Sequence, residues 1–194
     1  MSTGKDLGRR GRGPTDRGRR KKIADAAIAV VAERGVEGVT HRAVATAAGV
    51  PLGSTTYHFA TLGDLLAVAL HTAAEDNIAR LRAWEHALSP DADLAAGLAG
   101  LVVRGLTEER TQTVVEYELY VAALHRPPLR HASTGWDDAL VELFAYRTDA
   151  VTGRLLAATF CGLLMQALLT DPPPTVTEIE AIFRRALGGR PGGL

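Results

Sequence analysis

The stretch from Thr40 to Phe59, THRAVATAAGVPLGSTTYHF, restricts the possible folds more than any other part of the chain. Thr40 can cap a helix by accepting a backbone N–H bond, and apolar residues then follow at helical spacing. The residues of this predicted inward face are Val44, Ala47 and Ala48. Gly49 can adopt the positive φ that ends a helix tightly, and Pro51 prevents that helix from continuing. The stretch therefore predicts two short helices joined by a tight turn.

The second of these helices has a surface that suits a polyanion. Its residues are small, polar or aromatic, with no carboxylate among them, and include Gly53, Ser54, Thr55, Tyr57 and His58. Phe59 follows as the apolar anchor that we expect to be buried. A tight helix pair whose second helix repels no phosphate is typical of a helix-turn-helix that reads DNA.

Charge is distributed unevenly along the chain, although the formal net charge of its 194 residues is zero. Residues 1–22 hold nine Lys or Arg and two Asp, and residues 1–62 carry a net charge of +6. The remaining residues, 63–194, therefore carry −6. One end of the chain is thus suited to an anionic partner.

The amino-terminal part divides into an arm and a folded unit. Residues 1–16 have too little apolar surface to fold, so we expect a disordered basic arm. This arm is either a solvated tail or a segment that engages phosphates or a minor groove. Over residues 17–62 we predict a three-helix DNA-binding domain whose first helix ends at Gly35. The basic run that opens this domain contains Arg17, Arg19, Arg20, Lys21 and Lys22.

Residues 63–194 have the pattern of a second helical domain, so the predicted fold class is all-α. Thr61 and Asp64 have the spacing of a capping box that opens one long helix leaving the first domain. Pro90 is predicted to occupy the first position of the next helix. The segment 108–125 is apolar on most of its circumference, which predicts a central helix covered on several sides.

Polar groups on this central helix indicate a ligand pocket. Glu118 and His125 fall on one line of the helix, so a carboxylate and an imidazole can face the same interior space. Buried polar groups need partners, which are either intramolecular hydrogen bonds or a ligand. The candidate pocket residues are Trp84, Leu101, Tyr117, Glu118, Val121, His125 and Phe144. Such a pocket favours an apolar or aromatic molecule over a sugar or a nucleotide.

The last two helices are predicted to pair with a symmetry mate. Residues 155–169 hold no charge, but these 15 residues fall short of the about 20 that cross a bilayer, so we predict a buried helix and no membrane partner. A second possible capping box, Thr175 with Glu178, opens the final helix. A helix that is apolar all round needs cover on every side, which favours a four-helix interface in a homodimer. The predicted interface residues are Leu156, Phe160, Leu163, Leu164, Ala167, Ile179, Ile182 and Phe183.

Several chemistries lack support in the sequence. Cys161 is the only cysteine, which excludes an internal disulfide and a zinc finger and fits a reducing compartment. The six histidines show no metal-binding spacing, and neither G-x-S-x-G nor a glycine-rich phosphate loop is present. We therefore expect no catalysis, no cofactor and no metal. The basic amino terminus is followed by no apolar signal region, so we expect a cytoplasmic protein.

The order of these elements resembles the TetR family of one-component transcriptional repressors. The specific part is residues 20–66, where THRAVATAAGV, GSTTYHF and a later D-L-L are similar to the family's helix-turn-helix and the start of its fourth helix. The resemblance implies that Tyr57 and His58 contact the DNA backbone or base edges. It also implies phosphate contacts from Thr40 and Arg42 and base contacts from Gly53, Ser54 and Thr55. Where the family commonly has a Tyr and a Lys, this chain has Thr56 and Leu62, so we assign more of the affinity to the basic run.

These features predict a ligand-responsive repressor that binds a palindromic operator in double-stranded DNA as a homodimer and is released by a small molecule. Two alternatives stay open at this point. The chain can be an architectural DNA-binding dimer without an effector, or an all-helical enzyme that uses Glu118 and His125 as an acid/base pair.

Overall fold

The computed structural model describes residues 14–188, and this range is helical without strands, which confirms the predicted all-α fold. The elements at the amino-terminal end are α1 (Pro14–Arg34), the 3-10 turn η1 (Val36–Gly38), α2 (His41–Ala48) and α3 (Leu52–His58). The remaining elements are α4 (Leu62–Ala87), α5 (Leu94–Leu106), α6 (Arg110–Ala122), the 3-10 turn η2 (Pro127–Leu129), α7 (Arg130–Ala145), α8 (Ala150–Leu169) and α9 (Val176–Ala186).

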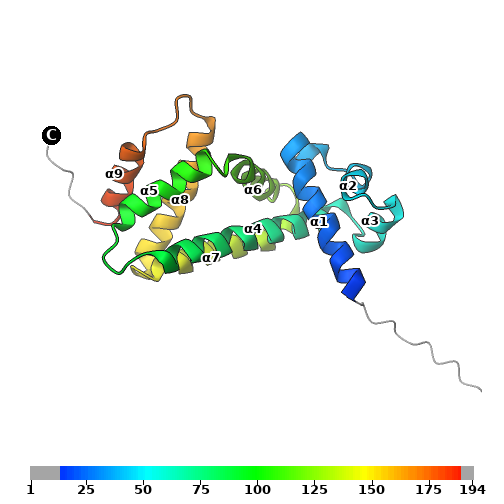
Figure 1. Ribbon diagram of the computed structural model, residues 1–194, viewed down its shortest axis with the longest axis horizontal. Coiled ribbons are helices and arrows are strands. Elements are labelled where there is room, and N and C mark those ends of the chain that lie inside the picture. The colour runs from blue at the N-terminus through cyan, green and yellow to red at the C-terminus, as the bar shows by residue number, and fades with distance from the viewer. Residues whose placement is uncertain (1–13, 189–194) are drawn as a thin grey trace, which may run out of the picture.

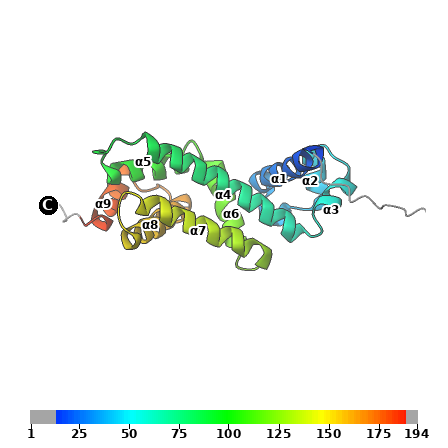
Figure 2. The same cartoon turned by 90° about the horizontal axis from the view of Figure 1, so that it is seen from below.

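The molecule is elongated, with α1, α2 and α3 gathered at one end and α5, α8 and α9 at the other (Figure 1). The helix α4 runs between these ends, and its 26 residues give a length of about 39 Å. α7 lies along α4, and α8 packs against α7 (Figure 2). α6 contacts both α1 and α4, so it connects the amino-terminal helices to the rest of the protein.

Both predicted capping boxes are present. The Thr61 hydroxyl accepts the N–H of Asp64 at 3.0 Å, and the Asp64 carboxylate accepts the N–H of Thr61 at 3.1 Å. Thr175 and Glu178 make the same reciprocal pair at the start of α9. Each box satisfies two backbone donors that the first turn of a helix leaves without partners.

The start of α5 differs from the prediction. Its N-cap is Asp93, whose carboxylate accepts the N–H groups of Ala95 at 3.1 Å and Ala96 at 3.2 Å. Pro90 therefore lies in the connection before the helix, and the prediction that it occupies the first helical position is wrong. A carboxylate cap satisfies two donors at once, whereas Pro only tolerates the position.

The amino-terminal boundary also needs correction. α1 begins at Pro14, so residues 14–16 are helical rather than part of a disordered arm. The rest of the predicted arm, residues 1–13, lies outside the described residues. On α2, the inward face includes Ala45, which is 5% exposed, whereas Ala47 is exposed, contrary to prediction.

A continuous apolar core joins the two ends of the protein. Phe59, directly after α3, is 1% exposed and belongs to the same buried cluster as Leu65 and Leu66 of α4. Burying a side chain of this size contributes about 1.5–3 kcal/mol. The recognition segment is therefore attached to the long helix by packing as well as by the chain.

The helix α8 is long and apolar enough to cross a membrane by length and composition. A core helix passes the same test. Only 33% of its apolar stretch is buried inside the protein, so one protomer alone does not cover α8 on every side. A large apolar part of its surface is left uncovered.

Candidate functional site

The α2–α3 pair is held by local contacts that the sequence predicts. The Thr40 hydroxyl accepts the N–H of Ala43 at 3.0 Å and so caps α2. Gly49 ends that helix in the left-handed region with φ +60°, where a side chain would be strained. Pro51 is the N-cap of α3, and the buried ring of Phe59 follows its last residue. The two helices are thereby fixed at a tight turn.

The outward face of α3 is free of acidic groups. Gly53, Thr56 and Tyr57 are exposed on this face, and Tyr57 is 79% exposed. Ser54 is half-buried. On the neighbouring α2 and its cap, Arg42 and Thr40 are also exposed. This surface can approach a phosphate backbone without repulsion, and its small residues allow close contact with base edges.

Two predicted DNA contacts are not exposed. Thr55 is fully buried and its hydroxyl donates to the Leu52 carbonyl at 2.8 Å, so the prediction that it faces bases is wrong. The exposed neighbour Thr56 was missed, although Thr55 lies four residues before the anchor Phe59 and therefore shares its buried face. The His58 side chain is only 7% exposed and lies 3.6 Å from the Asp16 carboxylate, so it faces α1 rather than outward.

The basic run on α1 contains groups with different environments. Arg17, Arg19 and Lys22 are exposed, whereas Lys21 is paired with Asp25 at 2.9 Å. The Arg20 guanidinium lies 4.5 Å from the centre of the Phe59 ring and donates to the His58 carbonyl at 3.0 Å. Arg20 therefore fastens the end of α3 to α1. Four of the five residues of this run are therefore exposed, whereas Arg20 is engaged within the protein.

A groove of about 940 Å³ lies between the end of α1 with η1, the helix α6 and the end of α8. Four of the predicted pocket residues line it together, namely Tyr117, Glu118, Val121 and His125. The volume is at the upper end of what ligand pockets in proteins have. The prediction that this line of α6 faces a common space therefore agrees with the geometry.

The other three predicted pocket residues do not reach this groove. Trp84 packs against α5 at Gly97, where its ring leaves no room for a Cβ atom. Phe144 packs edge-on against Phe160, with ring centres 5.7 Å apart. Leu101 lines a small enclosed cavity of about 30 Å³ on the other side of Tyr117. Helical spacing alone did not separate these core positions from the groove.

Glu118 connects α6 to the amino-terminal helices. Its carboxylate accepts the N–H of Val36 at 2.8 Å, and it lies against Gly35, whose φ is +71°. A second contact, between Arg126 and Glu37 at 2.8 Å, lies nearby. Because Glu118 serves as the acceptor for the backbone of η1, its geometry supports a positioning role more than an acid/base pair with His125.

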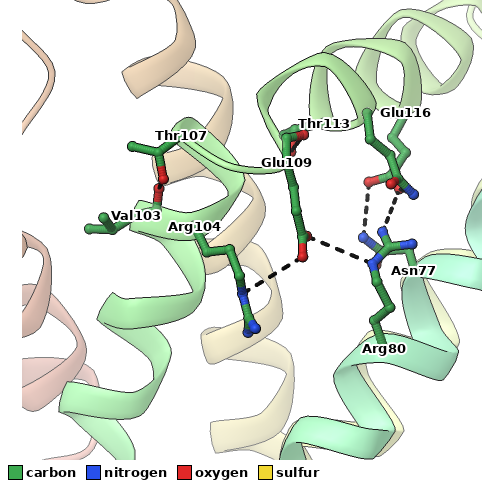
Figure 3. A network of polar contacts seen from close by, with 9 residues as sticks. Asn77, Arg80, Val103, Arg104, Thr107, Glu109, Thr113 and Glu116 are labelled. Atoms are coloured by element: carbon green, nitrogen blue, oxygen red, sulfur yellow. Dashed lines mark hydrogen bonds and ion pairs between the residues drawn. The ribbon is translucent and has the colours of Figure 1, made fainter.

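Glu116 is a buried polar group that the sequence analysis did not select. Its carboxylate accepts hydrogen bonds from Asn77 at 2.9 Å, Arg80 at 3.1 Å and Gln112 at 3.0 Å (Figure 3). Burial raises the pKa of Glu116 to about 7, although the Arg80 charge opposes this rise. Both Glu116 and Glu118 lie on an apolar helix, and the sequence offers no signal that distinguishes the more buried one.

The predicted interface residues lie mostly on the inward faces of α8 and α9. Six of them are buried within the protomer and cannot form an interface without unfolding it, namely Leu156, Phe160, Leu164, Ala167, Ile179 and Phe183. Leu163 is partly exposed, and Ile182 is 43% exposed. The outward apolar residues of α8 are instead Val151, Leu155, Ala158 and Leu169. The predicted residues therefore lie mainly on the inward faces of α8 and α9, and the exposed apolar residues of α8 lie on another face.

Known families and structures agree with this architecture. Residues 23–69 match the model described as bacterial regulatory proteins of the tetR family, and residues 89–189 match that of the tetracyclin repressor-like C-terminal domain. The chain belongs to the TetR family. Its transcription-regulator class and its helix-turn-helix are thereby established, and the family resemblance of the sequence is confirmed.

Several TetR-like structures are close in sequence and in fold. The multidrug binding protein EbrR complexed with ethidium is 45% identical with a TM-score of 0.79, covering 87% of this chain and 98% of EbrR. A TetR family member from Streptomyces coelicolor A3, SCO1917, is 46% identical with a TM-score of 0.76, covering 87% of this chain and 98% of that one. The regulator PksA of Bacillus subtilis (strain 168) is 41% identical over 64 residues, which are 33% of this chain and 31% of PksA.

Proposed function

We propose that this TetR-family regulator is a cytoplasmic homodimeric repressor that binds a palindromic operator and leaves it when an aromatic organic cation binds. The observation that carries the DNA-binding part is the outward face of α3, which exposes Tyr57 and no carboxylate. Exposed Arg17, Arg19 and Lys22 on α1 add positive charge at the same end of the molecule. In this proposal α3 enters the major groove, and the α1 cations contact phosphates.

The uncovered face of α8 supports the homodimer. Val151 is 80% exposed, Leu155 47% and Leu169 85%, although all three are large apolar residues. Ala158 lies between them on the same face and permits close approach of a second helix. An exposed apolar stripe on a soluble regulator typically marks an interface. In this proposal two copies pair through α8, with Ile182 of α9 at the edge, and the operator half-sites require their α3 helices to lie about 34–36 Å apart.

The proposed ligand class is based on the related structures. EbrR was solved with ethidium, with proflavin and with malachite green, and each of these is an aromatic organic cation. In this chain α6 lies between the amino-terminal helices and the remaining helices, with grooves on its flanks. A molecule seated beside α6 would shift α1 relative to α4 and change the spacing of the recognition helices. A coupling of about 1–3 kcal/mol would lower operator affinity 5- to 150-fold.

Selection of bound sequences from random DNA by the purified protein tests the first half of this proposal. We expect enrichment of an inverted repeat whose half-sites are separated by about one helical turn. Enrichment of a single half-site would contradict the dimer, and no enrichment would contradict a sequence-reading repressor in favour of an architectural role. The selected operator then serves for release assays with malachite green, whose propeller-twisted rings do not intercalate.

A further inference from the structure

An acidic groove of about 520 Å³ lies between α1, α4 and the amino-terminal part of α6. Five carboxylates line it, namely Asp25, Asp76, Glu108, Glu109 and Glu116, and its described lining contains no Lys or Arg. The remaining walls are mostly apolar side chains, three alanines among them. A groove with small apolar walls and negative charge is complementary to a flat aromatic cation.

Some of this negative charge is already neutralised from outside the groove. Asp25 is paired with Lys21 at 2.9 Å. Glu109 lies 3.7 Å from Arg80 and 3.8 Å from Arg104. Arg80 thus serves Glu109 and Glu116 at the same time (Figure 3). Three basic residues, Lys21, Arg80 and Arg104, are thus set against five carboxylates, so the groove retains an excess of negative charge.

Glu116 differs from the other four carboxylates because it is 3% exposed, whereas Asp25, Asp76 and Glu108 are on the surface. Its burial raises its pKa to about 7, which reports how poorly the site solvates the charge. Arg80 is the one charged donor among its three partners. A second cation that reaches Glu116 would therefore gain much more electrostatic free energy than a cation bound to a surface carboxylate.

An independent observation lies on the inner side of Glu116. The enclosed cavity of about 30 Å³ shares Glu109 and Glu116 with the groove and is also lined by Trp136 and Asn77. Trp136 is 7% exposed, and its indole N–H has no hydrogen-bond partner in the protein. The Asn77 side-chain oxygen is buried without a partner as well. Unpaired buried polar groups are costly, and a polar ligand that reaches them would relieve that cost.

We propose that Glu116 is the counter-ion of an aromatic organic cation that enters through the acidic groove and replaces Arg80 at the carboxylate. This assignment rests on the proposed function, because it names the site of the effector. The five carboxylates are not a metal site: within residues 14–188 no group of three or more His, Cys, Asp or Glu is placed to hold a metal ion. The occupant in this proposal is an organic cation with its charge spread over rings, because the remaining walls of the groove are mostly apolar.

The position of the groove explains how such a cation would act. One wall is α1, which carries the exposed cations and holds α3 through Arg20. The opposite wall is α6, and Arg80 connects α6 to α4 through Glu116. Displacing Arg80 removes that connection while the ligand separates α1 from α6. Both changes act on the helices that position the DNA-reading end.

The test compares ethidium, a permanent cation, with its neutral phenanthridine parent that lacks the N-ethyl group, in DNA-free binding titrations. Glu116→Gln keeps the size of the side chain but removes its charge. We expect this variant to bind ethidium about tenfold more weakly or worse, and the neutral parent as the wild type does. The matched control is Glu142→Gln on α7, which removes an exposed carboxylate far from the groove in sequence and should leave both affinities unchanged.

A second readout locates the ligand independently of Glu116. The chain has two tryptophans, so Trp84→Phe leaves Trp136 as the single tryptophan, whose emission can be excited selectively. Ethidium bound at Glu116 should quench the Trp136 emission strongly. This measurement keeps Glu116 in place, so it remains valid even if the Glu116→Gln variant fails to fold. Unchanged Trp136 emission on ethidium binding would overturn the proposal, as would wild-type ethidium affinity in a folded Glu116→Gln variant.

Failure of this inference differs from failure of the proposed function. If the wild-type protein binds ethidium and leaves its operator with malachite green while Glu116→Gln behaves identically, the effector class stands and the Glu116 site is wrong. If the wild-type protein binds neither dye, the effector class itself is wrong, and the Glu116 proposal falls with it.

Discussion

Arg20 and Arg19 are adjacent on α1 but should respond differently to the same substitution. Arg20 holds the end of α3 through the Phe59 ring at 4.5 Å and the His58 carbonyl at 3.0 Å. Arg19 is exposed and is available to phosphate. Arg20→Ala should therefore weaken the fold of the recognition segment, whereas Arg19→Ala should weaken DNA binding only through electrostatics.

The magnitudes follow from the contacts. A charge-assisted hydrogen bond contributes about 1.5–3 kcal/mol and a partly exposed cation–π contact about 0.5–1 kcal/mol. Because water can replace part of both contacts, we expect a loss of about 2 kcal/mol for Arg20→Ala, which lowers Tm by about 4–8 °C in a chain of this size. Arg19→Ala should leave Tm unchanged and reduce the slope of log K against log salt by about 1.8 per dimer.

Thermal melts followed by circular dichroism and operator titrations at several salt concentrations measure both quantities. An Arg20→Ala variant that melts like the wild type and flattens the salt slope as Arg19→Ala does would refute the reasoning. Arg20 would then be a phosphate contact rather than the residue that fastens α3.

Three further predictions concern the carboxylates of α6 and the face of α8. The folded-state pKa of Glu116 is about 7, above its ordinary 4.5, so ionisation of this carboxyl destabilises the fold. In urea unfolding, the stability of the wild type should fall from pH 5 to pH 8 by up to about 3 kcal/mol relative to Glu116→Gln. An equal pH dependence in both proteins would contradict this prediction. Glu118→Ala should speed hydrogen exchange of the Val36 N–H and lower the free energy of unfolding by about 1–2 kcal/mol. Glu118→Gln retains an acceptor and should keep this N–H protected. Equal protection of the Val36 N–H in both variants would contradict the contact. Leu155→Glu should yield folded monomers in sedimentation, while Leu156→Glu, at a fully buried neighbour, should unfold the protomer; a dimeric Leu155→Glu protein would place the interface elsewhere.

The local elements of the fold could be predicted from the sequence because their causes lie a few residues apart. Thr40 and Thr61 cap their helices with donors three positions away, and Gly49 adopts the left-handed conformation that its missing side chain permits. The line of α6 that contains Glu118 was found from helical spacing alone. Signals of this kind do not depend on which other helices pack nearby.

The misassigned residues depend on contacts between distant segments. α8 is apolar on almost every side, so its periodicity cannot tell the buried Leu156 from the exposed Leu155. His58 was assigned to DNA by the family resemblance, and its partner Asp16 lies in the arm that the sequence predicted to be disordered. Glu116 was overlooked because its partners Asn77 and Arg80 come from another helix.

Release of the selected operator by an aromatic cation tests the central claim most directly. The fluorescence anisotropy of the labelled operator, bound to the purified protein, is followed during titration with malachite green, and an unrelated protein–DNA complex serves as the control for effects on DNA. We predict a fall to the value of free DNA in the first complex only, with operator affinity reduced 5- to 150-fold for a coupling of about 1–3 kcal/mol. Unchanged anisotropy while the dye binds the protein would contradict a repressor that aromatic cations release.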